Sequence, residues 1–598
     1  MSTEKTGLPG QRLESHDANV DKEKLEGSSA SNSSMSLTEA EDSEARFEPI
    51  VKPNPNGNNL RQSRETLRTA SLRRERSNNG YGVDELDVDA PLGPDGLPLS
   101  RRKSSTKHVE DGTDDIEAVP DEKDPYEVVW DGGDSDPLNP RSMPLWRKWV
   151  IVGITSFGSL CVTNSSASYT ATYQQMNAEF HTTRLIATIG LSTFVFGIAM
   201  GPFWSPLAEF YGRRPIYLCS FLAFVIFMIP SAVAKNIETM IVVRFFQGLA
   251  GSAFLSVSGG TVGDLFERDK MQAPMAVFAV APFVGPATGP LLGGIICSFT
   301  GWRWLHYVLL MWAFGLLVSI ALFVPETYHP VLLKRKAALL RSSTGDPSYK
   351  SALEKSTKSI PQTVAWSLLR PFQIIILEPM CLILDIYSAI LLGILYLFFG
   401  AFPLVFSTNH GFNLWQVGLT FIGLLVSSIM AALSSGVWDK VRHTLMERRV
   451  QEVERTGEGE AKDEPEDQLP PVIVGAPLIT AGLFIFGWST YPWVHWIVPI
   501  VGSGIFGLGT MLAFTGIFTF LVDAYPRYAA SALAGNAFVR CSFAAIFPLF
   551  GVQMFEKLGY QWASALLGFL TLAMLPFPLL FFIYGKRLRA RSRFAAAP

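Results

Sequence analysis

The sequence predicts an all-α membrane protein with twelve transmembrane helices in two pseudo-symmetric six-helix bundles, preceded by a disordered N-terminal tail. Three observations lead to this fold class. Of the 598 residues, 48% are hydrophobic and only 17% are charged, a balance typical of polytopic membrane proteins. The first 146 residues are polar and contain no apolar run long enough to form a core. After them, apolar runs of about 18 to 25 residues follow one another, each long enough to cross about 30 Å of hydrocarbon.

The apolar runs fall into two series of six. The first is predicted near residues 149–170, 186–207, 216–234, 240–263, 273–298 and 305–324, and the second near 379–405, 414–438, 471–488, 493–520, 529–550 and 562–584. The predicted organisation is a disordered cytoplasmic segment 1–146, an N-terminal bundle 147–324, a cytoplasmic linker 325–372, a C-terminal bundle 373–585 with a cytoplasmic insertion 442–469, and a basic cytoplasmic tail 586–598.

Basic residues predict the orientation of the chain. Arg213, Arg214, the run from Lys334 to Lys336 and the tail after Tyr584 lie on one set of alternating connections, and the other set carries fewer Lys and Arg. Because positive charge accumulates on cytoplasmic loops, both termini are expected in the cytoplasm. The five cysteines lie in apolar runs without a pairing pattern, so no disulfide framework is expected.

A stripe of glycines marks the fifth predicted span. Gly285, Gly289 and Gly293 recur at a spacing of four, Pro286 and Pro290 stand beside two of them, and Gly294 follows. This spacing places the three glycines on one helical face, where a neighbouring backbone can pack closely. The prolines remove backbone donors and favour a bend. We therefore expect a kinked, closely packed helix that is suited to be a pivot.

The connection between the second and third spans carries charge of both signs. Glu209 precedes Gly212, Arg213 and Arg214. A carboxylate beside two guanidinium groups can form a latch that holds neighbouring helices in one conformational state. The alternative is that the arginines serve only to orient the chain, which would leave the acid and the glycine unexplained.

A permanently charged side chain interrupts the fourth span, where Arg244 precedes Gln247. A guanidinium inside a span is costly and normally faces a cavity or a partner. Because Arg244 does not deprotonate, we expect it to act on a nearby acid or to hold an anionic group. The alternative is a side chain that reaches back to the membrane surface.

These three stretches together resemble the major facilitator superfamily, and specifically the twelve-span drug:proton antiporters of fungi. The resemblance rests on Glu209 to Arg214, on Arg244 with Gln247, and on the Gly285–Gly294 stretch, and it extends to Pro325-Glu-Thr-Tyr328 and the region around Asn536. It covers about residues 130 to 593. It implies that Glu209, Arg213 and Arg214 form the latch, that Arg244 couples proton binding to motion, and that the glycines form a pivot between the two bundles.

The function implied by this resemblance is proton-coupled export of amphipathic organic compounds across the plasma membrane by alternating access. Antifungal drugs, toxins, secondary metabolites and polyamines are all candidate substrates, and a nutrient-uptake carrier or a transporter-like receptor are the alternatives. We expect no enzymatic activity, no metal and no cofactor besides the proton gradient, since the sequence contains no phosphate-binding loop, metal-ligand spacing or nucleophile motif. The partners expected are a small organic substrate, protons and the bilayer, with no nucleic acid and a monomeric chain.

One intramembrane acid is a candidate proton carrier. Asp385 lies inside the seventh predicted span, and Tyr396 falls on almost the same helical face eleven residues later. A carboxylate in a span is a functional candidate, and the alternative is a structural hydrogen bond to a neighbouring Ser or Tyr. The residues expected to line a substrate cavity are polar groups inside spans: Asn164, Gln247, Tyr387, Tyr396, Asn536 and Arg540.

Basic residues precede three serines in the N-terminal segment, namely Ser71, Ser77 and Ser104. This pattern makes them candidate targets of kinases, because a phosphate there would invert the local charge. The alternative is an unmodified basic segment that lies over anionic lipid.

Overall fold

The computed structural model describes residues 126–131, 133–267, 270–355, 360–456, 464–526, 528–590 and 592–595. Within this part of the chain, twelve helical segments are long and apolar enough to cross a membrane. The predicted kinase targets Ser71, Ser77 and Ser104 lie outside the described residues.

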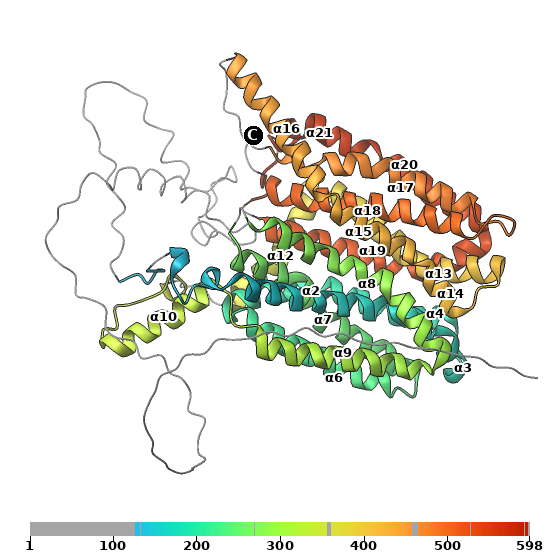
Figure 1. Ribbon diagram of the computed structural model, residues 1–598, viewed down its shortest axis with the longest axis horizontal. Coiled ribbons are helices and arrows are strands. Elements are labelled where there is room, and N and C mark those ends of the chain that lie inside the picture. The colour runs from blue at the N-terminus through green and yellow to red at the C-terminus, as the bar shows by residue number, and fades with distance from the viewer. Residues whose placement is uncertain are drawn as a thin grey trace, which may run out of the picture. The chain divides into compact units, whose positions relative to one another are not determined.

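The first six spans form the N-terminal half. They comprise α2 (Leu145–Ser168) with α3 (Tyr173–Phe180), α4 (Arg184–Ala199) with α5 (Trp204–Tyr211), α6 (Arg213–Ala232), α7 (Ile237–Leu265), α8 (Gln272–Phe299) and α9 (Trp302–Phe323). Figure 1 shows these helices running side by side in the blue-to-green part of the chain. Their inward faces carry fully buried aromatic side chains such as Phe194, Phe224 and Phe254.

The last six spans form the C-terminal half, which runs from yellow through orange to red in Figure 1. They comprise α13 (Pro379–His410), then α14 (Leu414–Thr420) with α15 (Ile422–Leu433) and α16 (Ser435–Thr456), α17 (Pro470–Trp488), α18 (Ile497–Ala524), α19 (Ala529–Leu558), and α20 (Tyr560–Met574) with α21 (Pro576–Arg589). The two halves meet where α4 packs on α19 and where α8 packs on α14 and α15.

Several spans are broken where the local sequence does not support a continuous helix. Within the second span, α4 ends at Ala199, and Pro202 lies in a short 3₁₀ turn, Gly201–Phe203, before α5 begins. The twelfth span breaks at Leu575, before a segment with proline in its first turn. Proline lacks a backbone donor and is tolerated at the start of a helix. By contrast, α8 stays helical through Pro282, Pro286 and Pro290.

The linker is more structured than the sequence indicates. It contains α10 (His329–Thr344), α11 (Ala352–Lys355) and α12 (Ile360–Leu377). The expectation of disorder up to residue 146 is wrong for the described residues from 126 onward. Val128 N donates to Lys350 O at 3.0 Å and Lys350 N donates to Tyr126 O at 3.1 Å, so this stretch pairs with the linker. We call residues Tyr126–Ser142 the strap.

The predicted insertion 442–469 lies between α15 and α17 and is partly helical. Helix α16 extends to Thr456, but the chain returns and is fixed by ion pairs at residues 464–468. Arg449 makes a bidentate contact of 2.8 and 2.9 Å with Asp467, and Arg589 of α21 makes a second one of 2.8 and 2.8 Å with Glu466. Charged groups of the insertion therefore hold α16 and α21 at the entrance to α17.

Candidate transport site

A buried acid lies on α13 in the C-terminal half. The Asp385 side chain on α13 is fully buried, and its Oδ1 accepts a hydrogen bond of 2.9 Å from Asn536 Nδ2 on α19. The same amide nitrogen donates to Ser388 Oγ at 2.7 Å, and Cys381 Sγ donates to Asp385 Oδ2 at 3.5 Å. A carboxyl group in this environment can hold or release a proton without direct contact with bulk water.

Arg540 lies one helical turn after Asn536 on α19. Its guanidinium carbon lies 4.8 Å from the centre of the Phe518 ring and 5.4 Å from that of Phe514, both on α18. The ring of Phe283 on α8, in the other half, lies 5.9 Å away. Arg540 Nε and Nη1 are buried and have no hydrogen-bond partner among the residues that the structure describes. Buried polar atoms normally have a partner, so these two donors are available to a bound molecule.

Arg244 is buried in the N-terminal half and is held by backbone carbonyl groups. Its Nε donates to Gly190 O at 2.9 Å, and its Nη2 donates to Ser165 O and Ser166 O at 3.2 and 3.3 Å. The last carbonyls of α2 lack partners within a regular helix, and Arg244 supplies donors to two of them. The guanidinium carbon also lies 4.0 Å from the centre of the Tyr169 ring, a favourable cation–π distance.

The sequence led us to expect an acid or an anionic group next to Arg244. In the structure, carbonyl oxygens and aromatic rings occupy that place, while Asp385 belongs to the other half. The connection is indirect. Ser166, whose carbonyl binds Arg244, also places its hydroxyl 3.3 Å from the hydroxyl of Tyr396 on α13. Arg244 therefore binds the backbone of Ser166, and the side chain of Ser166 makes a hydrogen bond to the other half.

The glycine stripe on α8 packs within the N-terminal half. A Cβ atom added at Gly289 would lie 2.6 Å from Ala167 Cβ and 2.7 Å from Ser168 N, and one at Gly293 would lie 2.8 Å from Ser168 O. Gly285 likewise faces α2 at Thr163. The close packing expected of Gly285, Gly289 and Gly293 is present, and the helix that covers their common face is α2 of the same half. Their role as a pivot between the halves stays a prediction.

The contact of α8 with the other half lies beside that stripe. A Cβ added at Gly294 would lie 2.9 Å from Leu414 O at the start of α14, and one at Gly418 would lie 2.5 Å from Pro290 O. Pro290 and Gly294 therefore contribute the close backbone approach between the halves. Gly294 on α8 and Gly418 on α14 have no side chain, which allows the two helix backbones to approach closely.

Two acids outside the predicted set contact the arginines of the latch. Arg213 Nε lies 3.1 Å from Asp264 Oδ2 at the end of α7, and both side chains are buried. Glu326, which follows α9, accepts hydrogen bonds from the backbone nitrogens of Arg213 and Arg214 at 2.8 and 3.2 Å. Glu326 thus caps the start of α6, where backbone donors lack partners. Glu209 lies on α5, four residues before Arg213.

Gly212 permits this arrangement. It has a φ of 96° between α5 and α6, and a Cβ there would lie 2.6 Å from the carboxyl carbon of Glu326. Residues with a side chain rarely adopt this backbone conformation. Both missed acids had a signal in the sequence, since Asp264 opens an Asp-x-x-x-Arg pattern and Glu326 lies in Pro325-Glu-Thr-Tyr328.

The remaining predicted cavity residues have various positions. Gln247 Nε2 donates to Phe227 O and Ser231 Oγ of α6 at 2.9 and 2.7 Å, so Gln247 joins two helices of the same half. Asn164 Nδ2 donates to Thr288 Oγ1 of α8 at 2.9 Å. Its Oδ1 is buried and has no hydrogen-bond partner within the described part of the chain. Tyr387 is buried on α13. Of the predicted set, Tyr396 and Arg540 contact the opposite half.

A second group of charges lies outside the spans, where the strap meets α10. Lys336 Nζ lies 2.8 Å from Asp136 Oδ2 and 2.8 Å from Asp131 Oδ2. Burial opposes charge on Asp136, but the hydrogen bonds from Lys336 and from backbone nitrogens outweigh it and hold the pKa of Asp136 below its ordinary value. Burial likewise opposes charge on Lys336, yet the two carboxylates raise its pKa.

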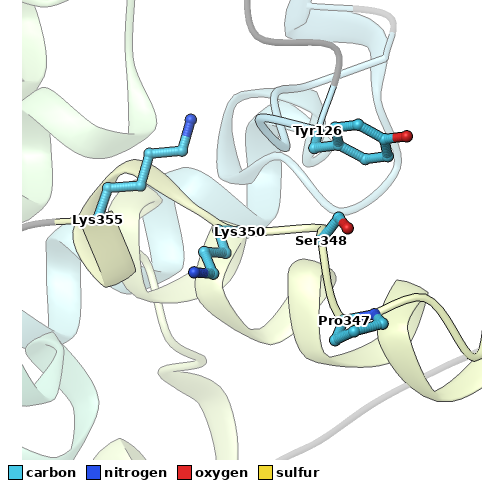
Figure 2. Close-up of a pocket in the computed structure, with 5 residues that line it drawn as sticks. All are labelled: Tyr126, Pro347, Ser348, Lys350 and Lys355. Carbon is cyan, nitrogen blue, oxygen red and sulfur yellow. The ribbon is translucent and has the colours of Figure 1, made fainter.

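Figure 2 shows a pocket of about 550 Å³ at this junction, lined by Tyr126 of the strap and by Pro347, Ser348, Lys350 and Lys355 of the linker. Lys355 Nζ is already paired with Glu127 at 3.1 Å. None of the five lining residues belongs to a candidate membrane span. This pocket is therefore a feature of the strap and linker and is separate from Asp385.

Comparison with known proteins agrees with this architecture. Among relatives, an efflux pump named atB from Aspergillus terreus is 50% identical over 83% of this chain and 96% of the relative. A multidrug transporter named mdrA from Aspergillus fumigatus is 39% identical over 79% of this chain and 77% of the relative. A probable drug/proton antiporter named YHK8 from Saccharomyces cerevisiae is 38% identical over 79% of this chain and 91% of the relative.

Among solved structures, that of the human organic anion transporter MFSD10 has a similar fold, with a TM-score of 0.52 at 15% identity, and covers 73% of this chain and 100% of that chain. The family model described as Major Facilitator Superfamily matches residues 155–548, from α2 into α19. With twelve candidate spans in two contacting halves and these relatives, the chain belongs to the major facilitator superfamily.

Proposed function

We propose that this chain is a proton-coupled exporter of amphipathic organic compounds, such as antifungal drugs, toxins or secondary metabolites, in the plasma membrane, with both termini in the cytoplasm. The observation that carries the proposal is the buried Asp385 carboxyl group, held by Asn536 one turn from the unpaired donors of Arg540. The names of the relatives support export, since they describe efflux pumps, a multidrug transporter and a drug/proton antiporter. The same names favour export over uptake or a receptor role.

In the proposed cycle, Asp385 takes up a proton from outside and releases it to the cytoplasm while the two halves rock about their contact. Asp385 lies on α13, and Tyr396 on the same helix reaches Ser166 of the other half. A change of charge on α13 can therefore alter a contact between the halves. Arg244 is a positioning residue in this scheme, because it fixes the carbonyls of Ser165 and Ser166. The proton gradient is the energy source.

The substrate is proposed to lie between the halves, next to Arg540. The rings of Phe283, Phe514 and Phe518 offer apolar surface from α8 and α18, and the two unpaired guanidinium donors offer hydrogen bonds. Ligand pockets of this kind combine aromatic walls with a few polar groups that fix orientation. Asn536 Oδ1 and Asn164 Oδ1 are further candidate contacts, because both are buried and neither has a partner in the described ranges of the chain.

The test is efflux of a fluorescent lipophilic cation from energised cells that express the chain, with and without a protonophore. We expect lower accumulation than in cells lacking the chain, and loss of the difference when the protonophore collapses the gradient. The variant Asp385→Asn is measured in the same way, and Asp523→Asn is its control. Asp523 is exposed at the end of α18 and contacts Gln468. Equal accumulation in cells with and without the wild-type chain would contradict the proposal.

A further inference from the structure

The C-terminal tail is docked on the junction between the linker and α13. Glu378, the residue between α12 and α13, is buried, and its Oε1 accepts hydrogen bonds from Arg593 N and Phe594 N at 3.0 and 3.2 Å. Its Oε2 accepts from Ser592 Oγ at 2.7 Å and from Tyr525 OH, after α18, at 3.3 Å. The ring of Phe594 also packs edge-on against Tyr528, with 5.3 Å between ring centres. The Glu378 carboxylate thus binds the tail at the start of α13, and Phe594 packs the tail against the segment between α18 and α19.

Ser592 is the centre of this contact. Its hydroxyl donates to Glu378 and accepts from Phe594 N and Ala595 N at 3.2 and 2.9 Å. The hydroxyl therefore both shapes the turn of the tail and ties that turn to the buried acid. Any change that removes the donor or adds negative charge at this atom acts directly on docking.

The sequence around Ser592 is suited to a kinase that prefers basic residues. Arg589 and Arg591 stand three and one positions before the serine, and Arg593 follows it. The hydroxyl is partly covered in the docked tail, and Arg589 is paired with Glu466. A kinase would therefore act on the undocked tail, which is the form in which an extended peptide can enter its active site.

We propose that Ser592 is a phosphorylation site and that its phosphorylation releases the C-terminal tail from Glu378. In the modification step a serine kinase transfers the γ-phosphoryl group of ATP. The bond between the γ-phosphorus and the bridging oxygen of ADP breaks, a bond between Ser592 Oγ and phosphorus forms, the hydroxyl proton passes to the kinase base, and ADP leaves. This inference concerns regulation and does not depend on which substrate is exported.

Two effects prevent the phosphorylated tail from docking again. The modified oxygen has no proton to donate to Glu378, and a phosphate group carrying about −1.5 to −2 charges would lie against a buried carboxylate. Like charges in a poorly hydrated place repel strongly. Phosphorylation therefore shifts the tail towards the undocked population and leaves Tyr525 as the remaining hydroxyl partner of Glu378.

The release would reach the candidate transport site through two helices. Glu378 lies seven residues before Asp385 at the start of α13, and Tyr528 lies eight residues before Asn536 at the start of α19. The docked tail thus contacts the beginnings of both helices whose side chains form the hydrogen bond between Asp385 and Asn536. Undocking removes a restraint on both.

The experiment uses the purified full chain, ATP and a serine kinase that is first shown to phosphorylate a synthetic peptide of residues 586–598. Mass spectrometry of the C-terminal peptide then locates the phosphate, with Ser592→Ala as the control. Trypsin cleavage after Arg593 reports docking, because the nitrogen of the next residue is bound to Glu378. The same cleavage of the synthetic peptide, with and without phosphate, corrects for the protease's own preference.

We expect phosphate on Ser592 and, after this correction, at least tenfold faster cleavage of the phosphorylated chain. In Glu378→Gln the acceleration should shrink, because the repelling carboxylate is gone. Absence of phosphate from the full chain, when the peptide is modified, would overturn the assignment of the site. Phosphate without faster cleavage would overturn the release.

Discussion

Asn536 and Asp385 form a hydrogen bond of 2.9 Å that joins α19 to α13 inside the C-terminal half. The bond holds the buried Asp385 carboxyl group against the buried amide of Asn536, which lies four residues before Arg540 on the same face of α19. Polar groups are retained in a membrane interior when they have partners and a role. We therefore expect that a substitution of Asp385 that removes its ionisable proton mainly affects proton-coupled efflux. A substitution of Asn536 that removes its amide donor should mainly affect stability.

Asp385→Asn should abolish proton-coupled efflux while the protein still folds. The amide has nearly the same shape as the carboxyl group and can still accept from Asn536, but it cannot release a proton. We expect efflux to fall at least tenfold, measured as the protonophore-sensitive rate, with an unchanged elution profile in size-exclusion chromatography. Asp523→Asn is the matched control, and an equal loss in that variant would mean that the effect is not specific to Asp385.

Asn536→Ala should destabilise the protein, because the buried Asp385 would lose its strongest donor. An unpaired buried polar group costs about 1–3 kcal/mol. We expect a lower midpoint of thermal unfolding in detergent. Asp385→Ala removes the acceptor, so Asn536→Ala should lower the midpoint less in the Asp385→Ala background than in the wild type. Additive effects of the two substitutions would contradict a direct interaction.

Gly289→Ala should weaken the packing of α8 on α2. The new methyl group would lie 2.6 Å from Ala167 Cβ and 2.7 Å from Ser168 N, and backbone cannot move aside easily. Overpacking of this kind costs about 1–3 kcal/mol. Gly315→Ala on α9 is the control, because a Cβ there meets nothing within 4 Å. We expect a lower unfolding temperature for Gly289→Ala, and the prediction fails if both variants behave alike.

Gly418→Ala should impair the close contact between the halves. The added Cβ would lie 2.5 Å from Pro290 O and 3.2 Å from Leu291 Cα. Because this contact joins α14 to α8, we expect transport to fall at least fivefold with little change in unfolding temperature. Gly436→Ala on α16 is the control, since its surroundings are open. Wild-type transport by Gly418→Ala would show that the approach of α14 to α8 is not needed.

Docking of the strap should depend on pH at both extremes. The pKa of Asp136 is lowered in the folded protein, so its stabilising contribution is present at neutral pH and is lost as the pH falls below about 4. The pKa of Lys336 is raised, so its contribution is lost only as the pH rises above about 10. Hydrogen exchange at the amides of Val128 and Lys350, which pair the strap with the linker, measures docking.

Lys336→Met should release the strap at neutral pH, where the wild-type protein holds it. The substitution leaves Asp136 buried without its cation, and Lys336 is the partner of both Asp131 and Asp136. Exchange at Val128 and Lys350 should accelerate at least tenfold. The same substitution at exposed Lys270, which pairs with Glu267, is the control. Unchanged protection at Val128 in Lys336→Met would contradict this role of the ion pairs.

Much of the fold follows from the sequence because hydrocarbon imposes it. Apolar runs of sufficient length predict spans, and all twelve spans have counterparts in the structure. Breaks such as those at Met200 and Phe421 escape a hydropathy pattern, since the chain stays apolar across them. The strap was missed for another reason: a polar segment without a core of its own becomes ordered here by pairing with Lys336 and Lys350.

The site was predicted in part. Asp385, Asn536 and Arg540 are polar residues inside apolar runs, and the structure brings Asp385 and Asn536 into contact. The direction in which a side chain points is not encoded in spacing alone. Spacing of four places Gly285, Gly289 and Gly293 on one face, but α2 covers that face instead of the other half. Which acid meets Arg213 likewise depends on how α6, α7 and the segment after α9 pack.

Proton exchange through Asp385 can be followed in liposomes that contain the purified chain and a pH-sensitive dye in the lumen. On addition of a fluorescent lipophilic cation outside, we expect that the substrate enters and the lumen becomes more alkaline, and that Asp385→Asn shows no such alkalinisation. Substrate entry without any change in luminal pH, or the same alkalinisation in Asp385→Asn, would contradict proton exchange through Asp385.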